Sequence, residues 1–358
     1  MKKYFLFLIS LVTGMFALNF ASNVDAFSST VMLEARSKMD IMLNQDLEMR
    51  KNMSQIIDCF IESTNISNPR IISGKDLQTA KITYLKNKAF TVNSARSCSP
   101  AGEQGGTGIA TISWTHRNVS FWISKSQAGV NDYDYQTQLA SNLYQAEQAL
   151  FYDAVDAYAL AYLAANKSTV NDAHGQPNTF NVDVMEVAKV DVKRFYTLLR
   201  SDMKLNNFKP TTGFYDIRNS AFEALHSEFG FGGISNTQDN AVANNIKTFD
   251  SNAIAIGAYS SYHYAVPFGG LYLLDRIPAM YDGEIRGAKQ MTQFASKLYP
   301  GKVLQLTIDK NCTDTSLTGG QVADAVDVYT LGWDFAAGAL PLSAAGETMI
   351  MPYATLAI

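Results

Sequence analysis

The sequence is poor in the residues that build metal sites and disulfide frameworks. Its 358 residues include three cysteines and four histidines. Cys59, Cys98 and Cys312 are far apart and odd in number, which argues against both a metal motif and a disulfide framework. No two histidines have the helical spacing that zinc enzymes use. We therefore expect no metal and no cofactor.

An excess of basic charge is also missing. The chain has 29 Lys and Arg against 33 Asp and Glu, which gives a net charge of -4 and a pI near 5.6. This balance excludes a basic stripe that grips nucleic acid, although a container that later releases its genome does not need one. The hydrophobic content of 47% is enough for a globular core, and the length allows two or three domain-sized units.

Patterns typical of enzymes are incomplete. No Gly-x-Ser-x-Gly elbow occurs. Asp153 and Asp156 are spaced as paired carboxylates would be, but acidic residues on a long helix usually form its wet face. The carboxylate and imidazole of Glu223 and His226 lack the second pair that a di-iron site needs. We expect no enzyme, although a catalytic triad is recognised by geometry and not by residue order.

No apolar run is long enough to cross a bilayer comfortably. The run from Tyr4 to Leu18 follows two lysines and precedes Val24-Asp25-Ala26, which resembles a cleavage site. Two interpretations stay open. Met1 to Ala26 is either a secretory signal peptide or an apolar arm that packs on a neighbouring subunit.

Two strand candidates flank a polar, glycine-rich segment. The strands are Ala80 to Val92 and Ile109 to Ser124, and the segment between them contains SARSCSPAGEQGGTG. Such a segment buries little and should project as a mobile loop. A phosphate cradle needs a helix after its glycines, whereas a strand follows here, so a nucleotide site is not favoured.

The most informative feature is a long helix that starts near Asp132 and continues to about Thr169. No basic residue occurs between Asn131 and Asn166. At about 1.5 Å per residue the helix would span on the order of 50 Å, so it must lie across its domain or between subunits. The alternative is an ordinary core helix that breaks near Asn166. Apolar residues recur at spacings of three or four, namely at Leu139, Leu143, Ala146, Leu150, Ala154, Tyr158 and Ala161.

Downstream, helices and short strands mix, which predicts an α+β fold. Val182 to Asn206 predicts a second helical region, and Asn219 should cap a helix from Ser220 to Phe229. The predicted strands are Thr211 to Ile217, Tyr262 to Val266, Gly270 to Ile277, Val303 to Ile308 and Met349 to Leu356.

This order of elements resembles the tailed-phage major capsid protein of the Hong Kong ninety-seven fold. The segments that carry the resemblance are RNVSFWISKSQAGVNDYDYQTQLASNLYQAEQALFYDAVDAYAL, TTGFYDIRNSAFEALHSEF and AVPFGGLYLLDRIP. The resemblance implies a phage capsid-like fold with an N-terminal arm (1–70), an extended two-stranded loop (71–130), a spine helix with a peripheral domain (131–210), a mixed apical domain (211–340) and a closing strand of the peripheral domain (341–358).

The resemblance also implies a function. The protein would be a self-assembling major capsid protein that forms an icosahedral shell around viral double-stranded DNA, without sequence-specific binding. Its partners would be copies of itself in pentamers and hexamers, with portal, scaffold or decoration proteins as further candidates and no membrane. It would lie in the virion after assembly in the host cytoplasm. The main alternative is an exported bacterial envelope or surface-binding protein, in the periplasm or at the cell surface. A nanocompartment shell of the same fold and a secreted hydrolase are weaker alternatives.

In such a protein, subunit interfaces carry the function and no pocket is needed. The glycine-rich loop should reach over a neighbour, and the aromatic residues around the long helix suit surfaces that are part buried and part wet. The candidate interface residues are Ser99, Gly102, Gly105, Gly106, Gly108, Trp122, Tyr144 and Phe151.

Overall fold

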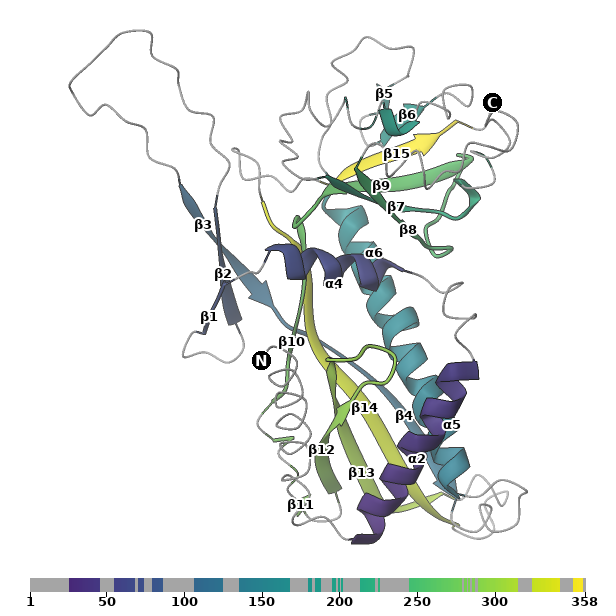
Figure 1. Ribbon diagram of the computed structural model, residues 1–358. Coiled ribbons are helices and arrows are strands. Elements are labelled where there is room, and N and C mark those ends of the chain that lie inside the picture. The colour runs from purple at the N-terminus through teal and green to yellow at the C-terminus, as the bar shows by residue number, and fades with distance from the viewer. Residues whose placement is uncertain are drawn as a thin grey trace, which may run out of the picture. The chain divides into compact units, whose positions relative to one another are not determined.

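A computed structural model shows an α+β fold, as predicted, in two compact units (Figure 1). Unit 1 comprises 1–51, 116–151 and 275–334, and unit 2 comprises 52–115, 152–274 and 335–358. The structure describes residues 26–45, 55–67, 70–73, 79–85, 106–124, 135–167, 180–181, 184–187, 195–197, 199, 201, 213–222, 225, 245–278, 280–281, 283, 285–286, 289–314, 324–341 and 350–356.

Unit 1 is built on a sheet in which the last long strand is central. Strand β14 pairs antiparallel with β13, which pairs antiparallel with β12 and so leads to β11, and β4 also pairs with β14. The strands are β4 (Thr115–Ser124), β11 (Ile285–Arg286), β12 (Lys289–Ala295), β13 (Val303–Asp314) and β14 (Asp324–Ala339).

Two helices lie side by side in unit 1, α2 (Ala26–Gln45) and α5 (Tyr135–Gln148) (Figure 1). The buried face of α2 carries Val31, Ala35 and Met39. Their spacing of four residues places them on one side of a helix, which explains why this segment packs as a helix. Residues 1–25 lie outside the described part of the chain.

The predicted long helix forms one continuous run of helical structure with a change of type inside it. Helix α5 passes directly into the π-helical segment η2 (Ala149–Val155), and η2 passes into α6 (Asp156–Ala165). The run ends at Ala165, where the backbone and side-chain nitrogens of Asn166 both donate to the Tyr162 carbonyl at 3.1 and 2.8 Å. Asn131 and Asp132, predicted at the start, lie outside the described residues.

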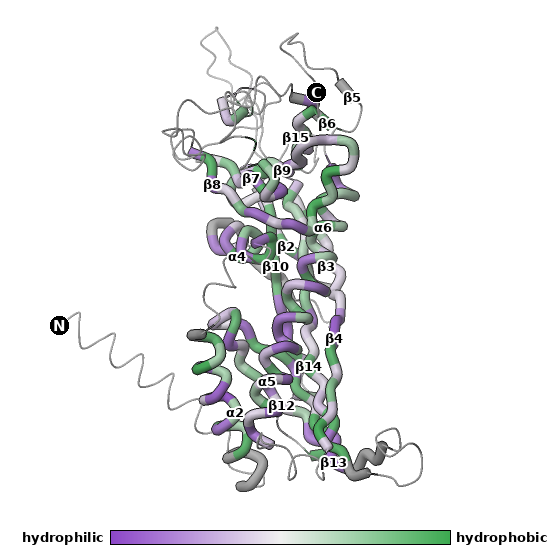
Figure 2. The backbone as a smooth tube through the Cα atoms, turned by 90° about the vertical axis from the view of Figure 1, so that its right-hand side faces the viewer, coloured by the Kyte–Doolittle hydropathy of each residue, from purple (hydrophilic) through white to green (hydrophobic). Residues whose placement is uncertain are grey.

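The π-helical segment changes which residues are buried. Up to its second residue, the buried positions include the predicted Leu139, Leu143, Ala146 and Leu150. From its last residue onward they are Val155, Asp156, Ala159 and Leu163, in place of the predicted Ala154, Tyr158 and Ala161. A π-helical turn holds one residue more than an α-helical turn, so the buried stripe falls later in the sequence. The division between the two units, at Phe151 and Tyr152, also lies in this segment. Figure 2 shows that α6 is largely hydrophobic, in accord with its sequence DAYALAYLAA.

Unit 2 contains a mixed sheet with the strand order β5-β6-β15-β9-β7-β8. Strand β7 is parallel to β8 and antiparallel to β9, and β15 is antiparallel to β9 and parallel to β6. Every residue of β7, β9 and β15 is buried, so these strands form the core of the sheet. The strands are β5 (Phe180–Asn181), β6 (Val184–Val187), β7 (Phe214–Arg218), β8 (Ile246–Asp250), β9 (Ser261–Pro267) and β15 (Met351–Thr355).

Helix α4 (Ile56–Ser67) contacts α6, β7 and β8 within unit 2. Asp156 of α6 is buried, and its Oδ1 accepts a hydrogen bond of 3.2 Å from the Ile57 backbone N–H in the first turn of α4. A carboxylate satisfies a free N–H there and suits the positive end of the helix dipole. Asp153 is exposed, so the two aspartates predicted as a possible carboxylate pair lie in different surroundings.

A three-stranded antiparallel sheet with the order β1-β2-β3 completes unit 2, from β1 (Arg70–Ser73), β2 (Thr79–Leu85) and β3 (Thr107–Ser113). Its core cluster also includes residues of β10 (Leu271–Arg276) and of the end of β14. Gly338 of β14 permits this packing, because the Tyr272 ring occupies the space that a Cβ at Gly338 would need.

Several predicted elements differ from the structure. Val184–Val187 is a strand, so the helix predicted from Val182 is wrong at its start. The range 211–340, predicted as one apical domain, is divided between the two units, and the closing strand β15 pairs with β9 from that range. The predicted arm 1–70 contains α2, which packs on α5, and α4, which belongs to unit 2. Each unit is assembled from three stretches of the chain, and the five predicted domain ranges stay predictions.

Candidate functional site

The strands predicted on either side of the glycine-rich segment include β2 and β3, which pair antiparallel (Figure 1). The prediction of one strand from Ile109 to Ser124 is wrong, because its later part is the separate strand β4, which pairs with β14. Strands β2 and β3 pair from Thr79↔Ser113 to Leu85↔Thr107. One face packs on the cluster that contains Ile82, Ile112, Tyr272, Leu274, Ala336 and Leu340. Burial alternates along β3, and its other face is open. Ile109 points to the open face and is 62% exposed.

Gly108 was predicted in the projecting loop but lies inside β3. It is buried and stands opposite Tyr84, whose ring lies against it so closely that an added Cβ would clash. The absence of a side chain thus lets the tyrosine ring cover the strand. Gly106 is exposed just before β3, whereas Ser99, Gly102 and Gly105 lie outside the described residues.

Trp122 lies on β4 and is 40% exposed. Its neighbours in sequence hold the strand to β14, because Ser120 Oγ and Thr330 Oγ1 are 2.8 Å apart and the rings of Phe121 and Tyr329 stack at 5.3 Å. A tryptophan on a strand fixed in this way is a rigid apolar side chain that a partner could cover.

Tyr144 and Phe151 are placed differently from their predicted role at an interface. Both are buried in unit 1. The Phe151 ring packs on Tyr299 at 4.7 Å and on Trp333 at 5.0 Å. The aromatic residues around the helix reflect packing inside the chain here, and we do not include these two in the interface proposed below.

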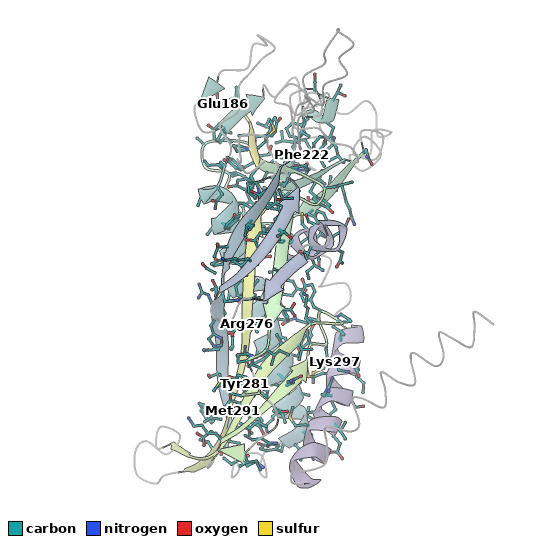
Figure 3. All side chains as sticks on the ribbon, turned by 90° about the vertical axis from the view of Figure 1, so that its left-hand side faces the viewer. Glu186, Phe222, Arg276, Tyr281, Met291 and Lys297 are labelled. Carbon is teal, nitrogen blue, oxygen red and sulfur yellow. The ribbon has the colours of Figure 1, made fainter. Side chains whose placement is uncertain are left out.

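Helix α2 is held in unit 1 by polar contacts and carries apolar side chains on its outside. Lys297 donates from Nζ to both carboxylate oxygens of Asp40 at 2.8 Å, and Lys38 Nζ donates to Thr137 Oγ1 at 2.8 Å. Figure 3 shows Lys297 beside α2. On the outward side of α2, Leu33 is 66% and Ile41 58% exposed.

A buried carboxylate joins α5 to the turn between β12 and β13. Glu147 accepts hydrogen bonds from Ser296 Oγ at 3.0 Å, from the Lys297 N–H at 3.1 Å and from the Leu298 N–H at 3.0 Å. Burial raises the pKa of Glu147, and these hydrogen bonds only partly oppose that effect. The sequence showed no sign of this contact, because the partners are about 150 residues apart.

A second contact that the sequence did not reveal is a Ser-His-Asp arrangement in unit 2. His263 Nε2 lies 3.2 Å from Ser261 Oγ, and His263 Nδ1 lies 3.0 Å from Asp216 Oδ1. All three side chains are 0% exposed. A nucleophile must reach its substrate, and the Ser261 hydroxyl donates to Thr355 Oγ1 at 2.8 Å, so the geometry describes a structural network and not a catalytic triad.

Two further properties of the described part of the chain concern metal binding and helices that span a membrane. Within it, no group of three or more His, Cys, Asp or Glu side chains is placed to hold a metal ion. None of the helices described there is both long and apolar enough to cross a membrane. Glu223 and His226 lie outside the described residues.

Comparisons with known proteins give matches at the level of structure only. No protein-family model matches the chain, and no curated protein matches it. A structure from Mycobacterium phage Che8 has 9% sequence identity and a TM-score of 0.47, with 84% of this chain and 90% of that chain covered. The mature capsid of bacteriophage PhiM1 has 11% identity and a TM-score of 0.45, with 78% and 83% covered. The capsid of Ralstonia phage GP4 has 10% identity and a TM-score of 0.46, with 78% and 84% covered.

Proposed function

We propose that this protein is a self-assembling major capsid protein of a tailed phage. The proposal is supported by the order of elements along the chain, in which a two-stranded hairpin and a return strand precede one long helical run. A strand-rich unit and a closing strand follow, as the resemblance in the sequence implies.

The observation that carries the proposal is the open face of β3. A strand that packs one face on a core and leaves Ile109 largely exposed on the other has a surface suited to a second copy of the chain. Full burial of one isoleucine contributes about 1.5–3 kcal/mol, so a single such contact is weak. In a closed ring every subunit repeats the contact, and weak contacts together hold the shell.

In this function Ile109 and Trp122 are the described apolar side chains that partner subunits cover, in pentamers and hexamers. The shell would enclose double-stranded DNA without sequence-specific contacts, in keeping with the net charge of -4. Portal, scaffold or decoration proteins would be further partners. The protein would lie in the virion after assembly in the host cytoplasm.

The test is electron microscopy and intact mass of the untagged chain, made without other phage proteins, together with two variants. We expect closed particles, tubes or sheets from the wild type. Ile109→Asp should give folded subunits that do not assemble, since the side chain is exposed in the single chain and a charge cannot be buried without cost. Ala157→Asp, which adds the same charge at an exposed position of α6, is the matched control and should assemble.

Two outcomes would contradict the proposal. Normal particles from Ile109→Asp would show that the open face of β3 is not an interface. A monodisperse wild-type monomer, recovered from the periplasm and shortened after Ala26, would establish the exported-protein alternative.

A further inference from the structure

Strand β3 lies at the edge of its sheet. In the described part of the chain the sheet has the order β1-β2-β3, so one edge of β3 pairs with β2 and the other edge has no strand beside it (Figure 1). No residue of β3 takes part in the backbone hydrogen bonds of the described turns and loops. The backbone N–H and C=O groups along this outer edge can therefore pair with a further strand.

The sequence of β3 lacks the devices that keep edge strands apart. Thr107–Ser113 reads TGIATIS and contains no charged residue and no proline. Proteins usually blunt an exposed edge with a lysine, a proline or a bulge. The register with β2 runs without a shift from Thr79↔Ser113 to Leu85↔Thr107, so β3 has no bulge either. A regular, uncharged edge of this kind favours the addition of a strand.

The residue types of β3 read the same in both directions about Ile109. Thr107 and Thr111 stand at the two ends of this stretch, and Gly108 and Ala110 flank the centre. The two threonines and Ile109 are exposed on the open face, whereas the two small residues point to the other face. An antiparallel strand with the same sequence would therefore place like residues opposite each other at all these positions.

We propose that β3 pairs antiparallel with β3 of a second copy across a two-fold axis at Ile109, which joins the two three-stranded sheets into one. In this register Thr107 faces Thr111 of the partner subunit, and Ile109 faces Ile109 of the partner subunit. Pairs of threonines and pairs of β-branched residues stabilise neighbouring strands, and the small residues on the other face do not crowd each other. A contact that uses the same surface on both copies is closed by the two-fold axis.

The partner is a second copy because the edge matches its own sequence. Strand addition takes its affinity from main-chain hydrogen bonds and its specificity from the side chains. Strand β3 has no charge that would select a charged partner, and its side chains fit the same sequence read backwards. This inference goes beyond the shell function, because the pairing uses the edge of β3 and leaves its open face for the contact proposed above.

The test is disulfide cross-linking between copies, because the two-fold register determines which positions meet. In Ile109→Cys the two cysteines would lie opposite each other, with Cα atoms about 4.5–5.5 Å apart, which a disulfide can span. In Thr111→Cys the two cysteines would lie at least about 13 Å apart along the strands, which a disulfide cannot span. A mixture of Thr107→Cys chains with Thr111→Cys chains would bring two cysteines together again.

Under mild oxidation we expect covalent dimers from Ile109→Cys and from the mixture, and only the background level from Thr111→Cys alone. The wild type carries the three native cysteines and sets that background. Ala157→Cys, at an exposed position of α6, is the matched control for random collisions. The replaced side chains of β3 are exposed, so we expect the variants to fold.

Two results would overturn the pairing, namely equal dimer yields from Ile109→Cys and Thr111→Cys, or an Ile109→Cys yield no higher than that of Ala157→Cys. The outcome is separate from that of the shell function. Wild-type particles without Ile109→Cys dimers would overturn the pairing and leave the shell function in place. Ile109→Cys dimers in the expected register, from a chain whose wild type forms no particles, would support the pairing and count against the shell.

Discussion

The contact between Glu147 and the turn after β12 gives the sharpest test of how unit 1 is held together. In Glu147→Ala the hydroxyl of Ser296 and the N–H groups of Lys297 and Leu298 lose their acceptor inside the protein. A buried donor without a partner costs about 1–3 kcal/mol. Partial relaxation of the turn reduces the summed cost of the three donors. We therefore expect the free energy of unfolding to fall by about 3–5 kcal/mol. Glu147→Gln keeps the size and one acceptor oxygen and should cost about 1–2 kcal/mol.

The same carboxyl group gives a pH dependence with a definite sign. Burial raises the pKa of Glu147 in the folded protein above its ordinary value of 4.5. Between these two values the folded chain holds a proton that the unfolded chain has released, so the free energy of unfolding falls as the pH rises. The stabilisation from this group is complete below pH 4.5 and is lost as the pH passes the raised pKa. Glutamine at position 147 does not titrate, so the unfolding free energy of Glu147→Gln should lack this pH dependence.

The assay is urea unfolding of unassembled subunits, followed by tryptophan fluorescence, to which the buried Trp333 of unit 1 contributes. We expect the Ile109→Asp background to keep all chains unassembled, and its exposed site in unit 2 should not couple to Glu147 in unit 1. A Glu147→Ala variant whose free energy of unfolding lies within about 1 kcal/mol of its parent's, where a loss of about 3–5 kcal/mol is expected, would refute the contact. Identical pH profiles for the parent and Glu147→Gln would refute the raised pKa.

Three further changes test other contacts. Leu150→Asp puts a charge on the buried face of the long helix, and we expect insoluble subunits; soluble, assembling protein would show that this face is not buried. Gly338→Ala should lower stability by about 1–3 kcal/mol because its Cβ meets Tyr272, and Tyr272→Leu should restore part of the loss. Asp156→Ala should cost about 1 kcal/mol by removing the acceptor at the start of α4, whereas Asp156→Asn should cost less; equal values in denaturant unfolding would contradict that role.

Elements with a strong local signal could be predicted from the sequence. The spacing of Leu139, Leu143, Ala146 and Leu150 gave the helix and its first buried face, which the structure confirms. Asn219 was predicted as a cap, and its Oδ1 accepts from the Ala221 N–H at 2.9 Å. Strands β7, β9, β10, β13 and β15 all lie where alternating or β-branched residues and turn signals placed them.

Other elements could not be predicted, because their cause lies far away in the sequence. Strand β14 contains few β-branched residues, and Gly338 leaves room for the ring of Tyr272 from β10. The local pattern of β14 therefore does not indicate a strand. Strand β6 depends on its pairing with β15, about 170 residues later. Trp122, predicted at a subunit interface, is exposed in the single chain, and its interface role stays a prediction. Tyr144 and Phe151 are buried by partners that the helix sequence does not show.

The π-helical segment has a consequence for how this chain tolerates length changes. Removing one residue from Ala149–Val155 would give an unbroken α-helix in which the later side chains keep their directions, because the π-helical turn holds that one extra residue. Rewinding the segment as an α-helix without removing a residue would instead turn every later side chain by about 100° relative to the earlier ones. Asp156 would then leave the start of α4, and the small and apolar residues Ala159 and Leu163 would leave the core of unit 2. The π-helical turn therefore accommodates one additional residue in this helix without changing which later side chains are buried.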